Sequence, residues 1–311
     1  MLKSELFVLA KVEPAPPLPK ADPNVINVRF SLFGESPARL RPISVLLGTP
    51  PDGLIEVHFD PNIICPSPPR FPERTNVLAF LRKSRNGKGY ETVALSYGAK
   101  TVSDEEATAY SQRITEWLDL ERRHPNGIPT NAVVEWLVKC VEMRATESEG
   151  AHELVDQRPL LGTNILRSPF APHLNTQQLL RLSNVVFRSE YITSGGLALL
   201  GLFEDKSRKQ VVLHVFGCLT RASTPIPPIG TPYKDCDGLP EPWNTFDAMW
   251  LLADLLDNPD VQAFVKRFNR TDFFSWENRV KQLKSFLPIV EAAAIKKGYL
   301  GDAPRGVQQR N

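Results

Sequence analysis

The sequence predicts an α+β protein of two domains, with a small antiparallel β-barrel over residues 1–100 and an all-helical domain over residues 101–311. Two observations lead to this prediction. Short apolar runs separated by Pro, Gly and Asn fill the first hundred residues, which is typical of strands and turns. From Ser103 onward, apolar residues recur at helical spacing. The chain is long enough for two domains of ordinary size.

Six strands are expected in the N-terminal domain. Their ranges are Glu5–Val12, Val25–Phe33, Leu40–Leu47, Leu54–Phe59, Asn76–Arg82 and Tyr90–Ser96. In the second strand Val28 and Phe30 alternate with polar residues such as Arg29, the period of two that buries one face of a strand. Thr49–Gly53 fits a proline and glycine turn, and Asn86-Gly87 fits a hairpin connection. Short strands without a helical period indicate a small closed or nearly closed barrel.

The helical part begins at Ser103, which starts a capping-box pattern with Glu106. Thr130 is expected to cap a second helix that ends near Met143, and the polar stretch Glu147–Gly150 is expected to be a loop. Further helices are expected at Thr176–Phe187, Leu197–Phe203, Gln210–Leu219, Phe246–Leu256, Val261–Phe268 and Phe273–Ala294. The sequence shows no repeat of fixed period, so an irregular bundle and a degenerate helical-repeat array of the armadillo or HEAT type both stay open.

Composition excludes several classes of protein. With 37 basic and 35 acidic residues, the formal charge is only +2, so no overall field attracts nucleic acid or a membrane surface. No run of about 18 apolar residues occurs, so we expect a soluble protein without membrane insertion. The apolar part of Met1–Lys11 is too short for a signal peptide. A cytoplasmic location is expected if Met1 is the native start, and a periplasmic or secreted one if a signal peptide has been removed.

Cysteine usage indicates neither a disulfide scaffold nor a metal motif. The chain has four cysteines without CxxC spacing, and isolated reduced thiols are expected. They are Cys65, Cys140, Cys218 and Cys236.

One long segment, Ser223–Trp243, is rich in proline and therefore cannot continue a helix. Loops of this length are uncommon in compact domains and often carry function. We therefore treat this segment as a possible contact surface for a partner protein. The residues expected to take part in partner binding are Pro227, Pro228, Tyr233 and Trp243.

The only group that suggests a metal site or an enzyme is formed by His58, Asp60 and Cys65. His58 and Asp60 are two residues apart on a strand and share a face, with Cys65 a short loop away. Imidazole, carboxylate and thiolate groups are zinc ligands, and a Cys–His pair can act as a nucleophile. A strand end followed by a turn explains the same residues, because ligand sets need convergent spacing and supporting contacts. We therefore assign no metal, no cofactor and no catalytic residue.

The N-terminal third resembles the netrin-like domain, an OB-type barrel also found in tissue inhibitors of metalloproteinases. The similar segments are Leu6–Val12, Ser44–Gly48, Gly53–Val57 leading to Cys65, and Val77–Leu81. The resemblance implies a binding module rather than an enzyme. In those inhibitors an N-terminal Cys-x-Cys presents its amine and carbonyl to the zinc ion of the protease. Here the chain begins Met1-Leu2-Lys3, which argues against inhibition by that mechanism.

We therefore expect a non-enzymatic interaction protein whose barrel and helical domain present a surface to another protein. One alternative is an enzyme or metal protein that uses the His58, Asp60 and Cys65 group. Another is a single-stranded nucleic-acid binder, which would use basic residues and stacking aromatics of the barrel. The latter is less favoured because most barrel aromatics fall on the strand face expected to be buried. Its basic groove would consist of Arg29, Arg39, Arg41, Arg82, Lys83 and Arg85.

Overall fold

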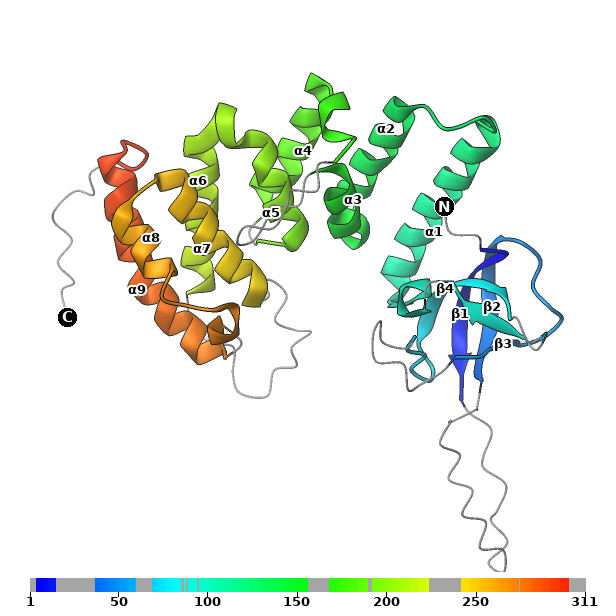
Figure 1. Cartoon of the computed structure of the whole chain (residues 1–311). Coiled ribbons are helices and arrows are strands. Elements are labelled where there is room, and N and C mark those ends of the chain that lie inside the picture. Colours follow the sequence, from blue (N-terminus) through cyan, green and yellow to red (C-terminus); the bar gives the residue numbers. More distant parts are fainter. Residues whose placement is uncertain are drawn as a thin grey trace, which may run out of the picture. The chain divides into compact units, whose positions relative to one another are not determined.

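The protein forms two compact units, which are described separately. They are Met1–Gly127, with the strands and the first long helix, and Ile128–Asn311, with the remaining helices (Figure 1). The predicted α+β layout of a barrel followed by helices is confirmed. The computed structural model describes residues 4–14, 37–59, 69–84, 87, 89–93, 95–155, 168–189, 192–223, 242–273 and 275–301.

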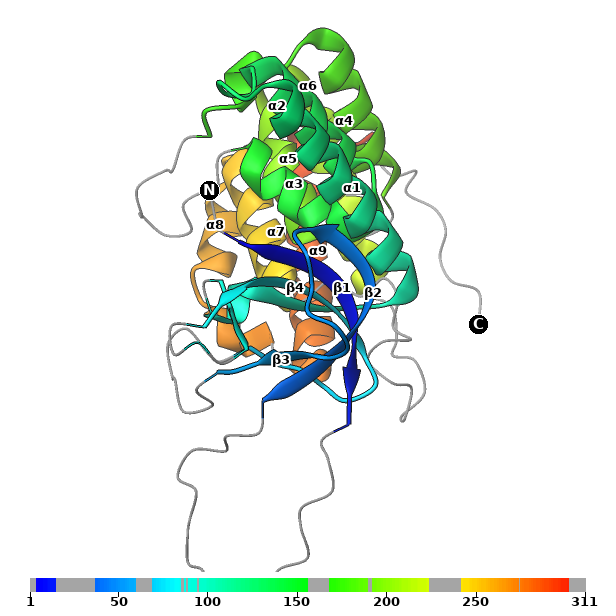
Figure 2. The ribbon, with the colours of Figure 1, turned by 90° about the vertical axis from the view of Figure 1, so that its right-hand side faces the viewer.

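Within the described residues, the first unit contains one six-stranded sheet. Its strands are β1 (Leu6–Glu13), β2 (Ala38–Leu47), β3 (Ile55–Val57), β4 (Asn76–Lys83), β5 (Tyr90–Thr92) and β6 (Ala99–Val102). The order is β1-β2-β3-β5-β4-β6, and β1 also pairs with β4, so that the first five strands close into a barrel. Figure 2 shows β1 between β2 and β4.

The barrel is mixed, whereas the sequence suggested antiparallel pairing throughout. β3 and β5 run parallel, and every other pair is antiparallel. The reason is geometric. A closed ring of five strands contains an odd number of strands, so strand direction cannot alternate all the way round. One pair must run parallel, and here it is the shortest contact, Val57 opposite Tyr90.

The barrel interior is filled by alternate residues of its strands, as the period of two predicts. On β1 these are Leu6, Val8, Ala10 and Val12, all at most 3% exposed. The other members of this core are Leu40, Ile55, Val57, Val77, Ala79 and Leu81. The barrel therefore has its own hydrophobic core.

Helix α1 (Asp104–Arg123) covers part of the outer face of the barrel. It begins with the predicted capping box, in which Glu106 N donates to Ser103 Oγ (3.2 Å) and Ser103 N donates to Glu106 Oε2 (2.7 Å). Ala107 of this helix packs with Leu9 and Leu78. The second apolar layer of the first unit thus lies between α1 and the sheet.

Two of the six expected strands are not found as expected among the described residues. Val25–Phe33 lies outside the described residues. The strand expected at Tyr90–Ser96 ends at Thr92, because Leu95–Gly98 forms a short 3-10 helix, and β6 follows it without having been expected.

The second unit is helical and shares one apolar core. Its helices are α2 (Thr130–Val141), α3 (Glu147–Leu154), α4 (Thr176–Arg188), α5 (Ser194–Leu200), α6 (Glu204–Ala222), α7 (Pro242–Leu256), α8 (Pro259–Val265) and α9 (Trp276–Lys296). All six further helices expected after residue 170 are present. The largest fully buried side chains of this core are Leu154, Leu182, Leu199, Leu200, Leu219, Met249, Phe273 and Phe286. Among the helices of the described chain, none is both long and apolar enough to span a membrane.

Two local predictions were wrong. Glu147–Gly150 was expected to be a loop, but it is the first turn of α3. Gly150 lies there because α3 approaches α2 closely: a Cβ at this position would be 2.7 Å from the Cβ of Cys140. Thr130 does not cap α2, since Pro129 occupies the N-cap position and no side chain caps the helix.

Candidate functional site

The most unusual surface of the first unit is the second half of β2, Arg41–Leu47, which we call the β2 edge. On one side β2 pairs with β1 along almost its whole length. On the other side only Ala38–Leu40 pair with β3. Within the described residues, the β2 edge has no strand neighbour on that side. It therefore presents backbone N–H and C=O groups that another chain can pair with.

The β2 edge is also apolar. Ile43, Val45 and Leu47 are 54%, 39% and 38% exposed, and they are three of the five large apolar side chains found exposed in the described chain. Pro42–Leu47 carries no charged residue. In natural proteins, charged side chains on an edge strand usually prevent it from pairing with other chains. Within the β2 edge, Pro42 and two bulges limit such pairing, but the stretch Ile43–Leu47 has no charged side chain, and its exposed apolar residues are typical of a contact surface.

Two bulges interrupt the β2 edge: one accounts for the exposure of Ile43, whereas Leu46 at the other packs with Leu9, Leu78 and Ala107. The pairing of β1 with β2 shifts between Phe7 and Val8 and again between Leu9 and Ala10, so that Leu46 and Ile43 have no opposite residue. A bulge inserts an extra residue and turns its side chain out of the regular alternation. Ile43, at one bulge, is the most exposed of the three.

The apolar surface continues from β2 onto neighbouring strands. Phe7 of β1 lies opposite Leu47 in the register, so both side chains point to the same face. Phe7 also packs edge-on against Phe80 of β4, with ring centroids 4.3 Å apart. Both rings are half-buried. The β2 edge therefore borders an aromatic pair.

The other end of β2 is positively charged. Glu13 accepts a hydrogen bond from Arg41 Nε at 2.6 Å, and this bond lowers the pKa of Glu13 below its usual value. The charges of Arg41, Arg39 and Lys11 act in the same direction. Glu56 of β3 lies opposite Arg39 in the register, so these three cations are flanked by two carboxylates, Glu13 and Glu56, and a small excess of positive charge remains beside the apolar stretch.

A hollow in the first unit lies between the turn before β3 and the loop that joins β4 to β5. It has a volume of about 440 Å³, and Gly89 lies in its wall with φ +61°. A Cβ at Gly89 would be 2.6 Å from the carbonyl oxygen of Glu56, so only glycine fits there. The lining residues are Pro51, Leu54, Glu56, Lys83, Gly87, Gly89 and Tyr90.

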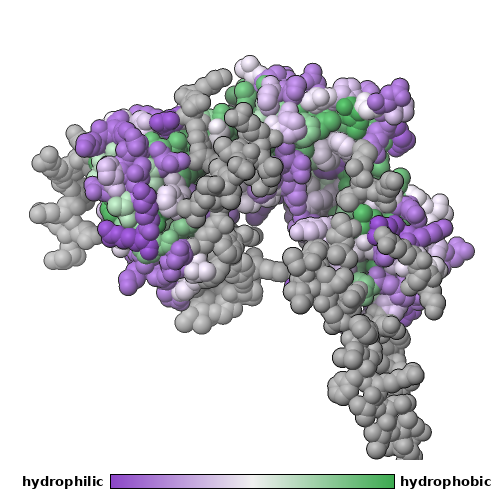
Figure 3. All heavy atoms as spheres, in the orientation of Figure 1, coloured by the Kyte–Doolittle hydropathy of each residue, from purple (hydrophilic) through white to green (hydrophobic). Residues whose placement is uncertain are grey.

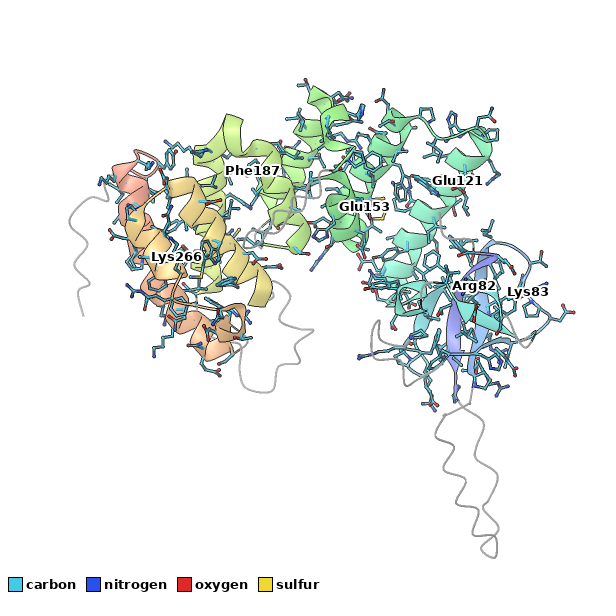
Figure 4. All side chains as sticks on the ribbon, viewed as in Figure 1. Arg82, Lys83, Glu121, Glu153, Phe187 and Lys266 are labelled. Atoms are coloured by element: carbon cyan, nitrogen blue, oxygen red, sulfur yellow. The ribbon has the colours of Figure 1, made fainter. Side chains whose placement is uncertain are left out.

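The cations near this hollow offer little to a nucleic acid. Arg82 Nε donates to Glu91 at 2.7 Å and is thus neutralised, as Arg41 is by Glu13. Figure 4 labels Arg82 and Lys83, which are adjacent on β4. Arg29 and Arg85 lie outside the described residues. A phosphate backbone would have to displace carboxylates from two of the predicted basic residues.

The residues predicted to form a metal site are only partly described. His58 follows β3, is half-buried, and donates its backbone N–H to the carbonyl of Tyr90 at 2.7 Å. Asp60 and Cys65 lie outside the described residues, as do Pro227, Pro228 and Tyr233. Trp243 lies in the first turn of α7. In the described part of the chain, no three His, Cys, Asp or Glu residues are placed to hold a metal ion.

A Cys–His pair that sequence analysis missed lies on α6, where the spacing of four residues was a usable signal. Cys218 Sγ is 3.7 Å from His214 Nε2 and 3.2 Å from Arg221 Nη2. Burial raises the pKa of the Cys218 thiol, and it also lowers the pKa of His214, where the charge of Arg221 adds to the effect. The pair is therefore a neutral thiol beside a neutral imidazole, which is the opposite of an activated nucleophile.

The geometry can thus bury an apolar segment of a partner at the β2 edge. Comparison of the chain with protein-family models, curated proteins and solved structures finds no match. The surfaces of the two units are therefore the basis for assigning a function.

Proposed function

We propose that this chain is a non-enzymatic interaction protein that binds another protein through the β2 edge of its barrel. The observation that supports this most is the uncharged, apolar stretch Pro42–Leu47, which has no pairing strand on one side among the described residues. The exposed parts of Ile43, Val45 and Leu47 amount to about 1.3 fully exposed side chains, so their burial stabilises a complex by about 2–4 kcal/mol.

The partner segment should be apolar where it meets Ile43–Leu47 and acidic where it reaches Lys11 and Arg39. An extended segment can add to an open strand side, with main-chain hydrogen bonds supplying affinity and alternate side chains supplying specificity. Pro42 has no N–H to donate, so the pairing region is expected within Ile43–Leu47. The positive charge around Glu13 favours an acidic residue at that end of the partner segment.

The resemblance to netrin-like barrels supports the same proposal, since such barrels generally bind partners and do not carry chemistry. The single-stranded nucleic-acid alternative has less support. It needs exposed aromatics beside free cations, but Phe7 and Phe80 are half-buried against each other, and Arg41 and Arg82 are held by carboxylates.

The test compares proteins captured from cell extract by the wild-type chain, by Ile43→Asp and by Leu180→Asp. Leu180 is a matched control, because it is a similarly exposed apolar residue, 61% exposed, on α4. Asp at position 43 removes apolar burial and places an unpaired charge in the interface, so recovery of the true partner should fall more than about tenfold.

Recovery of the partner should be unchanged for Leu180→Asp, and all three proteins should have the same circular dichroism spectrum. The proposal is wrong if every protein that the wild type and Leu180→Asp capture is captured equally well by Ile43→Asp.

A further inference from the structure

A separate surface in the helical unit lies between α8 and α9, and we call it the α8–α9 groove. It is a hollow of about 630 Å³. Its apolar residues are Ala263, Phe264, Pro288, Ile289, Ala292 and Ala293, and its polar residues are Asn258, Asp260, Arg267 and Lys296. The groove is apolar along its floor and charged along its rim.

The groove exists because large and small residues alternate along the two helices. Phe264 of α8 packs on Phe286 of α9 with ring centroids 5.4 Å apart, which holds the helices apart at that point. Ala263 and Ala292 are exposed and too small to fill the space beside these rings. The lining residues extend over about two and a half helical turns, or roughly 12–14 Å, along α8 with its flanks and along α9.

Pro288 lies inside α9, at the wall of the groove. Because it has no backbone N–H, it cannot make the helical hydrogen bond to the carbonyl of Lys284, one turn earlier.

Among the exposed charged residues from Asn258 to Lys297, basic residues outnumber acidic ones. Lys266, which Figure 4 labels, is next to Arg267 at the end of α8. Figure 3 shows green and white atoms bordered by purple ones at the end of the helical unit formed by α8 and α9. The exposed cations are Lys266, Arg267, Lys281, Lys284, Lys296 and Lys297, against the exposed anions Asp260, Glu277 and Glu291.

We infer that the α8–α9 groove binds an acidic amphipathic helix of a partner protein. An amphipathic helix places apolar residues into such a groove at positions i, i+3, i+4 and i+7. A third helix packs naturally in the depression between two others. Acidic residues along its flanks would face Arg267 and Lys296. The inference does not depend on the β2 edge.

The probe is a labelled peptide of about 18 residues with a leucine face and a glutamate face, bound to the full-length protein and followed by fluorescence anisotropy. Two control peptides have lysine in place of glutamate, or the same residues in an order that abolishes the apolar face. The glutamate amphipathic peptide should bind at least about tenfold more tightly than either control.

Protein variants locate the site. Ala292→Gln, at an exposed position, fills the groove, and a double variant with Arg267→Glu and Lys296→Glu reverses its rim. Each should weaken binding of the glutamate peptide by at least about tenfold, whereas Arg188→Glu on α4 should leave it unchanged. The inference fails if the glutamate peptide does not bind, if the groove variants bind it as the wild type does, or if the groove variants change only the oligomeric state of the protein.

Discussion

Arg181 of α4 joins α4 to α2 through two carboxylates, and its removal gives a quantitative prediction. Its Nε and Nη2 donate to Glu142 at 2.7 and 2.5 Å, and its Nη1 donates to Glu135 at 2.7 Å. Partial burial acts to raise the pKa of Glu135, but hydrogen bonds from Gln178 and Arg181 outweigh it, so that pKa lies below its usual value. The hydrogen bond to Glu142 contributes most to raising the pKa of Arg181. The three charges therefore stabilise one another in the folded state.

The expected size of the effect follows from the exposure of this cluster. A charge-assisted hydrogen bond contributes about 1.5–3 kcal/mol when it is well buried. The side chains of Arg181, Glu135 and Glu142 are 27%, 38% and 36% exposed, so solvent screens each bond considerably. Arg181→Met also leaves two carboxylates facing each other. We expect a loss of about 2 kcal/mol, which moves the urea midpoint by roughly 1 M.

The assay is urea unfolding followed by circular dichroism, on the wild type, Arg181→Met, Glu142→Gln and the double variant. The cycle should give a coupling energy of about 1 kcal/mol between Arg181 and Glu142, smaller at high salt. Additive effects, with coupling below about 0.3 kcal/mol, would show that these bonds contribute no energy between α2 and α4.

Two further predictions concern stability. Gly98→Ala should destabilise the first unit by more than about 2 kcal/mol in thermal unfolding, because a Cβ there overlaps the carbonyl oxygen of Val93. Gly53→Ala, with open space around it and φ +88°, should cost only about 1 kcal/mol; equal effects of the two variants would refute the packing argument. Burial lowers the pKa of His214, so the unfolded chain binds this proton more readily, and stability should fall as the pH drops below about 6.5. His214→Gln should remove that part of the pH dependence of the urea midpoint, and an unchanged dependence would contradict the assignment.

Much of the fold could be predicted because its signals are local. The alternation along β1 and the capping box of Ser103 and Glu106 depend only on neighbouring residues, and both are present in the structure. The helical start at Glu147 was missed because Gly150 resembles a helix breaker in sequence. Gly150 instead allows a close contact with Cys140 of the preceding helix, α2, and such a contact between two helices is not visible in the local sequence.

The candidate site depended on long-range pairing and therefore could not be predicted. Leu40–Leu47 was correctly expected to be a strand, but the sequence does not show that β3 pairs with only three of its residues. The lack of charge in Pro42–Leu47 was a signal in the sequence that could have indicated an apolar contact surface. The predicted group of His58, Asp60 and Cys65 stays a prediction, since only His58 is described.

The most direct test of the proposed function is amide hydrogen exchange of Arg41–Leu47, with and without a partner that Ile43→Asp fails to capture. In the free protein, the outward-facing amides of this stretch should exchange rapidly, because the described chain gives them no strand partner on that side. Bound partner should slow exchange within Ile43–Leu47 and leave α4 around Leu180 unchanged. Slower exchange elsewhere, with Ile43–Leu47 unaffected, would contradict binding through the β2 edge.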